Sequence, residues 1–312
     1  MFTRTRLLVL VLVAALVLPA GATVRILPLG DSITRGDPSP DSDAGSYRYY
    51  LYTRLVDAGY RVDFIGSTTQ PNFSRFSFDQ DHDGHGGYTT GMFLSYQGQE
   101  PLREWLAASG APDIVLLHIG TNDAVWQVDH GTRLENLAVI VRILQETNPR
   151  VTILLAQIIP TDNWFRNQRQ IDPFNAALPG LAANVSTASS RVIVVDQNSG
   201  FDGVNDTQAD GIHPNAEGMK KIAATWYRAL VPLLPAPSTT PFTVPGGVGP
   251  ARPLPGEGLY RDVNGNGRAD FADVVLLFSE LDWCAANAPG AFDFNANGRV
   301  DFADVVRLFE AL

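Results

Sequence analysis

The stretch "VRILPLGDSIT", residues 24–34, decides the fold, because it joins an apolar run to a polar turn that contains a serine. Residues 24–29 have the nearly continuous apolar character of a strand buried in a parallel sheet. Gly30 and Asp31 suit the backbone of a turn, and Ser32 follows them directly. Taken alone, the stretch favours a polar turn at a strand end over a nucleophilic serine.

The same alternation of short apolar runs and longer amphipathic stretches continues along the chain. We predict strands over residues 24–29, 62–65, 113–119, 151–158 and 192–195. We predict helices over residues 47–58, 99–109, 132–147, 169–188 and 215–230. Strands separated by helices indicate an α/β domain with three layers, α/β/α, around a central parallel sheet. Ligands bind such sheets beyond the carboxyl ends of the strands, where Ser32 lies.

The first residues have the features of an export signal. Residues 1–22 carry two arginines, then an apolar run, then Ala20, Gly21 and Ala22, as in a secretory signal peptide with its cleavage site. An uncleaved membrane anchor is the alternative, but the run is shorter than the roughly 20 residues that a span needs. We expect a secreted, extracellular protein that has no membrane segment after cleavage.

Charge and cysteine content narrow the classes of function. The chain has a net charge of −10 and no basic stripe, so we do not expect nucleic acid as a partner. Cys284 is the only cysteine, which excludes an internal disulfide. Its simplest role is that of a small buried apolar side chain.

Residues 232–258 are too dense in proline and glycine for a packed element. Such composition is typical of a semi-stiff linker between domains. The chain then divides into a signal peptide over 1–22, an α/β domain over 23–231, a linker over 232–258 and a small all-α domain over 259–312.

The last segment contains an internal repeat. "DVNGNGRADFADVVLLF" from Asp262 matches "DFNANGRVDFADVVRLF" from Asp293 at 13 of 17 positions, so two copies of one unit follow each other. Each copy places oxygen donors at the ligand positions of an EF-hand calcium loop, with a carbonyl from the arginine. These residues are Asp262, Asn264, Asn266, Arg268, Asp270 and Asp273, and then Asp293, Asn295, Asn297, Arg299, Asp301 and Asp304. We predict two structural calcium ions.

Two loop-helix copies with aspartate at the last ligand position, placed after a proline-rich linker, resemble a type I dockerin. The resemblance implies that a cohesin module of a scaffold or cell-surface protein is the partner. It also implies recognition through the pairs Phe271-Ala272 and Phe302-Ala303, whose identity suits binding in two orientations. The alternative is that these phenylalanines belong to the core.

Groups that could activate Ser32 occur in three later blocks. "ADGIHPN" places Asp210 three residues before His213, close enough for the acid to orient the imidazole. "LLHIGTND" supplies the amide of Asn122, and "HDGHGGYTT" contains Gly87, whose backbone N–H can approach a ligand closely. Each block alone is also a common turn or cap.

Together and in this order, the four blocks resemble the SGNH (GDSL-type) hydrolase family, which has a flavodoxin-like fold. The resemblance implies that Ser32 is the nucleophile, His213 the base and Asp210 the orienting acid. It assigns the oxyanion hole to the Ser32 and Gly87 backbone N–H groups and the Asn122 side chain, and it requires no catalytic metal.

One branch of the family is especially similar. The segments "ILPLGDSIT", "VDFIGS", "DHDGHGGYTT" and "DGIHPNAEGMKKIA" resemble carbohydrate esterase family 3 acetylxylan esterases. This implies an acetyl-enzyme on Ser32 and an acetylated polysaccharide as substrate.

Several neighbours of these blocks have two interpretations. Arg48, Tyr88 and Trp126 suit a substrate pocket, but a helix arginine is commonly a structural partner and aromatic residues commonly pack in cores. Trp164 is a further residue that could stack on a sugar ring. Asp81, His82, Asp83 and His85 could bind a metal or hydrogen-bond around Gly87.

The sequence therefore predicts a secreted serine esterase that acts on O-acetyl esters of plant polysaccharides and is tethered through a cohesin. Two alternatives remain open. One is a lipase, lysophospholipase or thioesterase for longer acyl chains, and the other is a non-catalytic surface-binding protein.

Overall fold

The computed structural model describes residues 23–36, 46–73, 78–235, 242–252, 260–295 and 299–312. The predicted signal peptide and Asn297 therefore lie outside the described residues. At the centre of the first domain is a parallel sheet with strand order β2-β1-β4-β5-β6, and β3 pairs with β1 beside this path. The strands are β1 (Val24–Gly30), β2 (Val62–Phe64), β3 (Asp83–Gly84), β4 (Ile114–His118), β5 (Thr152–Ala156) and β6 (Val192–Val195). The predicted parallel sheet is confirmed.

Small residues bring the carboxyl ends of the central strands together. Gly30, the last residue of β1, lies opposite Gly84 of β3 and His118 of β4. A Cβ atom at Gly30 would lie 2.3 Å from the His118 carbonyl oxygen, and one at Gly84 would lie 2.3 Å from the Arg35 nitrogen. Only glycine fits at these two positions, because the backbones approach so closely.

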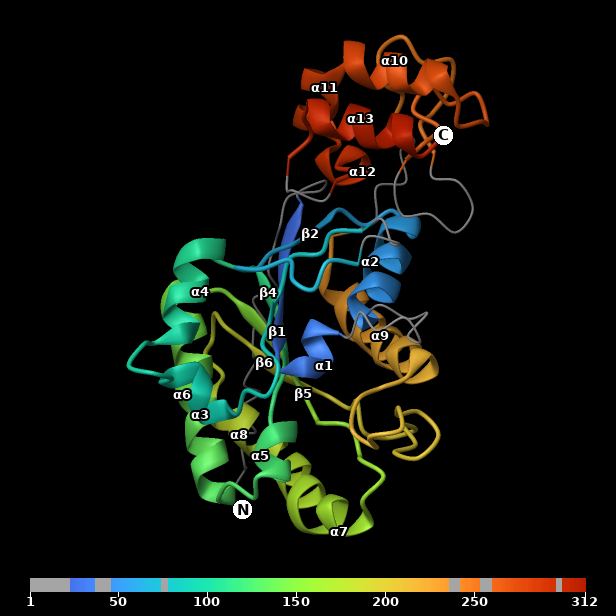
Figure 1. The fold of residues 1–312 in the computed structure, drawn as a ribbon. Helices are drawn as coiled ribbons and strands as arrows, with labels where there is room; N and C mark the ends of the chain where they lie inside the picture. The colour runs from blue at the N-terminus through green and yellow to red at the C-terminus, as the bar shows by residue number, and fades with distance from the viewer. Residues whose placement is uncertain (1–22, 37–45, 74–77, 236–241, 253–259, 296–298) are drawn as a thin grey trace, which may run out of the picture.

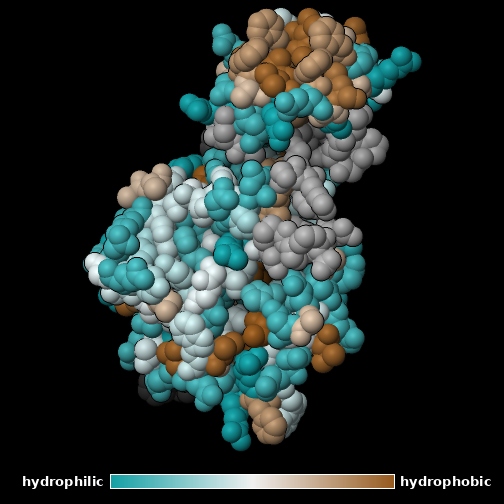
Figure 2. Space-filling view, in the orientation of Figure 1, coloured by the Kyte–Doolittle hydropathy of each residue, from teal (hydrophilic) through white to brown (hydrophobic). Residues whose placement is uncertain are grey.

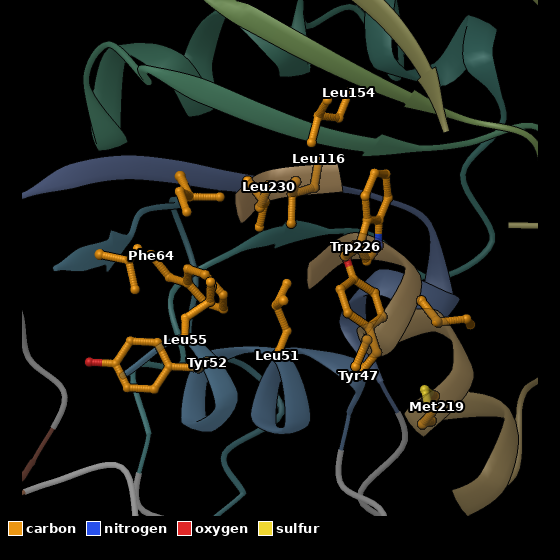
Figure 3. Packing of buried hydrophobic residues seen from close by; sticks show 14 of the residues in the cluster. Tyr47, Leu51, Tyr52, Leu55, Phe64, Leu116, Leu154, Met219, Trp226 and Leu230 are labelled. Atoms are coloured by element: carbon orange, nitrogen blue, oxygen red, sulfur yellow. The ribbon is translucent and has the colours of Figure 1, made fainter. Parts of the chain in front are cut away.

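Two helices, α2 (Tyr47–Asp57) and α9 (Ala216–Leu230), cover one face of the sheet. Their buried side chains, with Trp226 among the largest, point toward the sheet residues Leu116 and Leu154 in Figure 3. This layer carries the apolar stripe of α9 that the sequence predicted.

The opposite face of the sheet is covered by a larger set of helices. It comprises α3 (Thr90–Leu94), α4 (Pro101–Ser109), α6 (His130–Thr147) and α8 (Asp172–Val185), all of which contribute buried side chains to a second core. The result is three layers, α/β/α (Figure 1). The predicted helix over 169–188 differs at its start, because residues Asn167–Ile171 form a π-helical turn, η1, before α8 begins.

Short helices line the loops between these elements. They are α1 (Ser32–Arg35), α5 (Thr121–Val125), α7 (Trp164–Arg166) and the 3-10 turn η2 (Val231–Leu233). None of the helices in the described part of the chain is long and apolar enough to cross a membrane.

The C-terminal region forms a separate helical unit with its own core. It contains α10 (Phe271–Ser279), α11 (Leu281–Asn287), α12 (Pro289–Phe292) and α13 (Phe302–Glu310). Leu277, Phe292 and Leu308 are fully buried in this core. Cys284 is buried there too, and burial raises the pKa of its thiol to about 12.

The predicted linker over 232–258 is wrong for residues 242–252, which fold onto the C-terminal unit as a strap. Val244 of the strap is fully buried in the core of that unit. The backbone N–H groups of Val248 and Gly249 donate to the carbonyl oxygen of Asn264, at 2.8 and 3.1 Å. Proline and glycine density predicted an extended chain, but the glycines instead allow close contact with residues 262–266.

Candidate active site

Ser32 is the first residue of α1, directly beyond the carboxyl end of β1. Asp31 caps this helix, and its Oδ1 accepts the N–H of Ile33 at 2.9 Å. The turn therefore fixes the direction of the short helix and places the serine at the edge of the sheet. The two interpretations of the opening stretch are compatible, since the turn is what positions the serine.

His213 lies next to Ser32, although the two residues are far apart in sequence. The distance from His213 Nε2 to Ser32 Oγ is 2.8 Å, and from His213 Nδ1 to Asp210 Oδ2 it is 2.5 Å. The other carboxylate oxygen of Asp210 accepts the N–H groups of Ile212 and His213, both at 2.9 Å. Acid, imidazole and serine thus form one continuous chain of hydrogen bonds.

The charge state of Asp210 follows from these contacts. Partial burial alone would raise the pKa of its carboxyl, but the hydrogen bonds from the His213 ring and from two backbone N–H groups lower it below the ordinary value. Asp210 is therefore ionised at neutral pH and can hold the Nδ1–H tautomer of the histidine.

The loop that carries His213 is held on both sides. The His213 carbonyl oxygen accepts the N–H of Gln208 at 2.7 Å, and the N–H of Asp162 donates to the carbonyl of Gly211 at 2.9 Å. Gly211 has a φ of 66°, and a Cβ atom there would lie 2.0 Å from the Asp162 carboxyl carbon. The loop between β6 and α9 is thus packed directly against the loop that follows β5.

The predicted oxyanion hole has three hydrogen-bond donors, and the structure shows the local setting of each. The Ser32 N–H lies in the first turn of α1, and N–H groups in the first turn of a helix have no acceptor within that helix. Gly87 has a φ of 80°, and a Cβ atom there would meet nothing within 4 Å, so its backbone borders open space. Asn122 donates one amide N–H to the Tyr88 carbonyl at 3.0 Å, which fixes the amide and leaves its second N–H available.

A buried network that the sequence did not reveal supports these donors. Asp123, fully buried beside Asn122, accepts the Thr90 N–H at 2.9 Å and the Thr90 hydroxyl at 2.7 Å. Asn136 of α6 donates to the same hydroxyl at 3.1 Å. This network joins α5, α3 and α6, and so fixes the segment that carries Asn122 against Thr90, three residues after Gly87. The "GTND" motif contains Asp123, but the sequence does not show that Thr90 is its partner.

The structure corrects the assignment of Arg48 to a substrate pocket. Its side chain has no exposed surface. It donates to the carbonyl oxygens of Thr34, Arg35 and Gln80, at distances of 3.0, 3.0 and 2.6 Å. A guanidinium spreads its donors in a fork, which suits three carbonyls. Arg48 holds the end of α1 and does not face a pocket.

The other two predicted pocket residues differ from each other. Trp126 directly follows α5 as its C-cap and is 55% exposed. The Tyr88 ring packs among Phe93, Tyr96 and Trp105, while its carbonyl holds Asn122. A role for either residue in the pocket stays a prediction.

The loop from Asp81 to His85 is built as a hydrogen-bonded support. His82 is fully buried and its Nδ1 accepts the Gly84 N–H at 2.8 Å, while Asp83 accepts the Ser67 hydroxyl at 2.5 Å. The His85 ring stacks on Trp105 with centroids 3.6 Å apart. Within the described part of the chain, no three His, Cys, Asp or Glu side chains are arranged to hold a metal.

The repeat loops differ from the loop from Asp81 to His85 in their oxygen donors. Their aspartates are accompanied by asparagine side chains and backbone carbonyls. Asp262 accepts the N–H groups of Asn266 and Gly267 at 2.9 and 2.8 Å, and Asp273 accepts those of Asn264 and Asp270, both at 2.8 Å. Burial raises the pKa of the Asp273 carboxyl, and the nearby charges of Asp262 and Asp270 raise it further. These aspartates are close enough for their charges to act on one another, and oxygen donors of this kind suit a hard cation.

The second loop has the same geometry where it is described. Asp304 is fully buried and accepts the N–H groups of Asn295 and Asp301 at 3.0 and 2.7 Å. Burial again raises the pKa of this carboxyl. Both copies therefore share the capping box before a helix and the backbone contacts of the last aspartate in the loop.

The interpretation of Phe271 and Phe302 as core residues is wrong. These side chains are 62% and 60% exposed. Phe271 contacts Phe309, and Phe302 contacts Phe278, with ring centroids 6.1 and 5.9 Å apart. Figure 2 shows apolar side chains gathered over this part of the C-terminal unit. The two halves of the face are related by the internal repeat.

Comparisons with known proteins agree with this geometry. The model of the GDSL-like Lipase/Acylhydrolase family matches residues 29–221. A multidomain esterase from Ruminococcus flavefaciens is 31% identical over 285 residues, which cover 83% of this chain and 35% of that protein. The chain thus spans about a third of the length of this curated relative.

Two solved structures are also similar to the first domain. One is a family 3 carbohydrate esterase from Clostridium thermocellum, with 31% identity, a TM-score of 0.55, and coverage of 68% of this chain and 96% of that chain. The other is a carbohydrate esterase family 3 protein from Talaromyces cellulolyticus, with 30% identity, a TM-score of 0.58, and coverage of 68% and 98%.

Proposed function

We propose that this chain, which belongs to the GDSL-like lipase/acylhydrolase family, is a carboxylic ester hydrolase that removes O-acetyl groups from plant polysaccharides such as acetylxylan. The observation that carries the proposal is the hydrogen-bonded chain from Asp210 through His213 to Ser32. Similarity to two family 3 carbohydrate esterases supports the substrate class.

The first half of the proposed reaction transfers the acetyl group to the protein. Ser32 Oγ attacks the ester carbonyl carbon while its proton moves to His213 Nε2, and Asp210 stabilises the imidazolium that forms. The tetrahedral intermediate collapses when the bond to the sugar oxygen breaks. His213 gives its proton to that oxygen, so the deacetylated sugar leaves and an acetyl-enzyme remains.

The second half repeats these steps with water. His213 takes a proton from water as the hydroxyl attacks the acetyl carbon, and the bond to Ser32 Oγ then breaks. Acetate leaves and the serine recovers its proton from His213. In both halves the negative charge on the carbonyl oxygen is stabilised by N–H donors from Ser32, Gly87 and Asn122.

Substitution of the hydrogen-bonded pair tests this mechanism. We expect Ser32→Ala and His213→Ala to lower kcat on p-nitrophenyl acetate by about four to six orders of magnitude, because each removes a group that acts in the bond-forming step. Ser279→Ala and His130→Ala are matched controls outside the site. Full activity in either site variant, with circular dichroism unchanged, would refute the assignment.

The acyl group and the polysaccharide need a separate measurement. We expect acetate release from acetylated xylan, and rates on p-nitrophenyl esters that fall steadily from acetate to octanoate. A preference for octanoate or longer esters favours a lipase, lysophospholipase or thioesterase instead. Absence of turnover together with no labelling of Ser32 by a fluorophosphonate probe favours a non-catalytic binding protein.

We further propose that the protein is exported and that the C-terminal unit is a dockerin-like domain. Residues 262–273 and 293–304 would hold two calcium ions, and the ions would supply only structural support, by binding loop oxygens. The exposed face around Phe271 and Phe302 would then bind a cohesin module. The loop residues that are described, the paired helices α10 and α13 and the contacts between repeat-related phenylalanines support this assignment.

A further inference from the structure

Large apolar side chains are exposed on the described first domain at one end only. They are Trp126, Trp164, Phe165 and Val204, which are 55%, 64%, 62% and 69% exposed. They lie in the loops that follow β4, β5 and β6. These loops leave the carboxyl ends of the parallel strands, as does the Ser32 turn, so the exposed apolar surface and the catalytic residues share one edge of the sheet.

Trp164 and Phe165 are the first two residues of the short helix α7. Their ring centroids are 5.0 Å apart with an interplanar angle of 79°, and the Arg169 guanidinium lies 5.6 Å from the Phe165 centroid. Figure 1 shows α7 beside α5 at the end of the sheet where the strands finish. A ligand that covers this exposed aromatic pair would remove its apolar surface from water, which is favourable.

The turn that presents this pair is tightly hydrogen-bonded. Asn163 caps α7 by accepting the Arg166 N–H at 3.0 Å. The Asn167 side chain accepts the Thr161 N–H at 2.9 Å and donates to the Thr161 carbonyl at 2.7 Å. The aromatic rings are therefore carried on a pre-formed support, which lowers the entropy lost when a ligand binds.

The same turn touches the histidine loop directly. Asp162, two residues before Trp164, donates its N–H to the Gly211 carbonyl at 2.9 Å. A Cβ atom at Gly203, near Val204, would lie 2.2 Å from the Thr161 carbonyl oxygen. The turn that carries the aromatic pair therefore packs directly against the loop that holds His213.

We propose that Trp164 and Phe165 form a platform for the sugar rings of a polysaccharide chain whose acetylated unit lies at Ser32. The inference rests on the proposed function and adds a binding site to it. A pyranose ring has an apolar face of C–H groups and a rim of hydroxyls. The exposed rings offer the apolar surface, and Asp162, Asn163 and Gln168 at their border, all exposed, offer hydrogen-bonding groups.

The openness of the platform argues for a sugar chain over a long acyl chain. An acyl chain has no hydroxyls for the polar border and gains most from enclosure, whereas both rings are more than 60% exposed. The neighbouring carbohydrate esterases point the same way. Because the platform would bind sugar units other than the one at Ser32, it should add binding energy for polymers alone.

Kinetics on two substrates test the proposal. We expect Trp164→Ala to raise KM for acetylated xylan about ten-fold, with kcat nearly unchanged, because an exposed tryptophan contact is lost from ground state and transition state alike. Values for p-nitrophenyl acetate should stay within two-fold of the parent. Trp164→Phe should recover most of the polymer KM, and Val248→Ala, an exposed apolar residue on the strap, is the matched control.

Binding of xylohexaose to the Ser32→Ala protein, followed by calorimetry, separates this inference from the proposed function. Binding that Trp164→Ala abolishes supports the platform even if acetylxylan is not deacetylated. Polymer activity that is insensitive to Trp164→Ala overturns the platform and leaves the esterase function standing. Equal losses on both substrates, or a dimer in sedimentation that Trp164→Ala dissociates, also overturn it.

Discussion

Asp31 stands between the sheet and the proposed nucleophile, and its environment is unusual for a carboxyl group. It is fully buried, and burial raises its pKa to about 7, while the Ile33 N–H and the charge of His213 pull the value down only in part. One oxygen caps α1, and the other has no hydrogen-bond partner among the described residues. The cap that aims Ser32 is thus maintained against a desolvation cost.

The pKa of Asp31 predicts how stability changes with pH. An unfolded chain ionises this group near its ordinary value of 3.8, but the folded protein keeps the proton until about pH 7. Stability is therefore lost as pH rises from about 4 to about 7, and is level above that range. We expect Asp31→Asn, which keeps the helix cap without the charge, to gain stability over the parent across this window, reaching a few kcal/mol.

Urea denaturation at a series of pH values measures the difference. Asp196→Asn is a control of opposite sign, because hydrogen bonds from Ser199 and Asn198 outweigh burial and lower the pKa of Asp196. A stability difference for Asp31→Asn that is flat between pH 4 and pH 8 would contradict the prediction.

Arg48 gives a second prediction at this scale. Replacing it by methionine leaves three buried carbonyl groups without their donor, and we expect a loss of about 3 kcal/mol or more in the free energy of unfolding. Arg54→Met, on the exposed side of the same helix with its guanidinium 4.1 Å from the Tyr227 centroid, should lose about 1 kcal/mol or less. Thermal melting compares the two, and equal losses would show that the carbonyl contacts contribute little.

Residues with a local signature could be predicted from the sequence, and residues defined by distant partners could not. Ser32 and the Asp210/His213 pair stand in short motifs, and the structure brings them within hydrogen-bonding distance. The choice between a pocket role and a structural role for Arg48 could not be made, because sequence spacing does not reveal that the end of α1 and the residues near Gln80 meet around it. Its burial depends on tertiary contacts, which periodicity does not encode.

At the scale of elements, the strap over 242–252 is the main departure from expectation. An antiparallel bridge joins Arg252 to Asp262, and Gly249 lies so close to Gly265 that a Cβ on Gly265 would be 2.2 Å from the Gly249 carbonyl carbon. Within the described residues 242–252 and 260–261, no helix precedes the first loop, and the strap contacts that loop instead. The long strands and helices were predictable from their periodicity, whereas β3 has two residues and α1 has four, too few to show any period.

The contact between strap and loop predicts a difference between two glycines. Gly265 and Gly267 both have positive φ, at 71° and 89°, but only Gly265 has atoms in the place of a Cβ. Gly267→Ala should lose about 1 kcal/mol of stability in the C-terminal unit from backbone strain. Gly265→Ala should lose clearly more and should detach the strap. Faster hydrogen exchange at the Val248 and Gly249 amides in Gly265→Ala alone is the expected readout; equal exchange in both variants would contradict it.

On the scale of the whole molecule, two folded units meet at the amino ends of the strands. Tyr260 packs against the core of the first domain as well as that of the C-terminal unit. Thr23, Tyr60 and Val62 on one side and Phe242 and Pro289 on the other line a small cavity there. The separate cores predict separate unfolding transitions, modified by this contact.

Calcium removal should affect the two units unequally. If the repeat loops bind the ion, excess calcium stabilises the C-terminal unit by RT ln(1 + [Ca²⁺]/Kd), about 4 kcal/mol at a thousand times Kd. We expect a chelator to lower the calorimetric transition of that unit by several degrees, while p-nitrophenyl acetate hydrolysis persists. Magnesium at the same concentration is the control. No shift with chelator would count against the calcium assignment.

The position of the C-terminal unit has a consequence for reach. It sits at the end of the sheet where β1 begins, and the serine lies where β1 finishes (Figure 1). Seven residues of strand span about 23 Å. If a partner binds the face around Phe271 and Phe302, the edge of the sheet that carries Ser32 would point away from that partner. The protein could then act on an insoluble substrate while it stays bound to its partner.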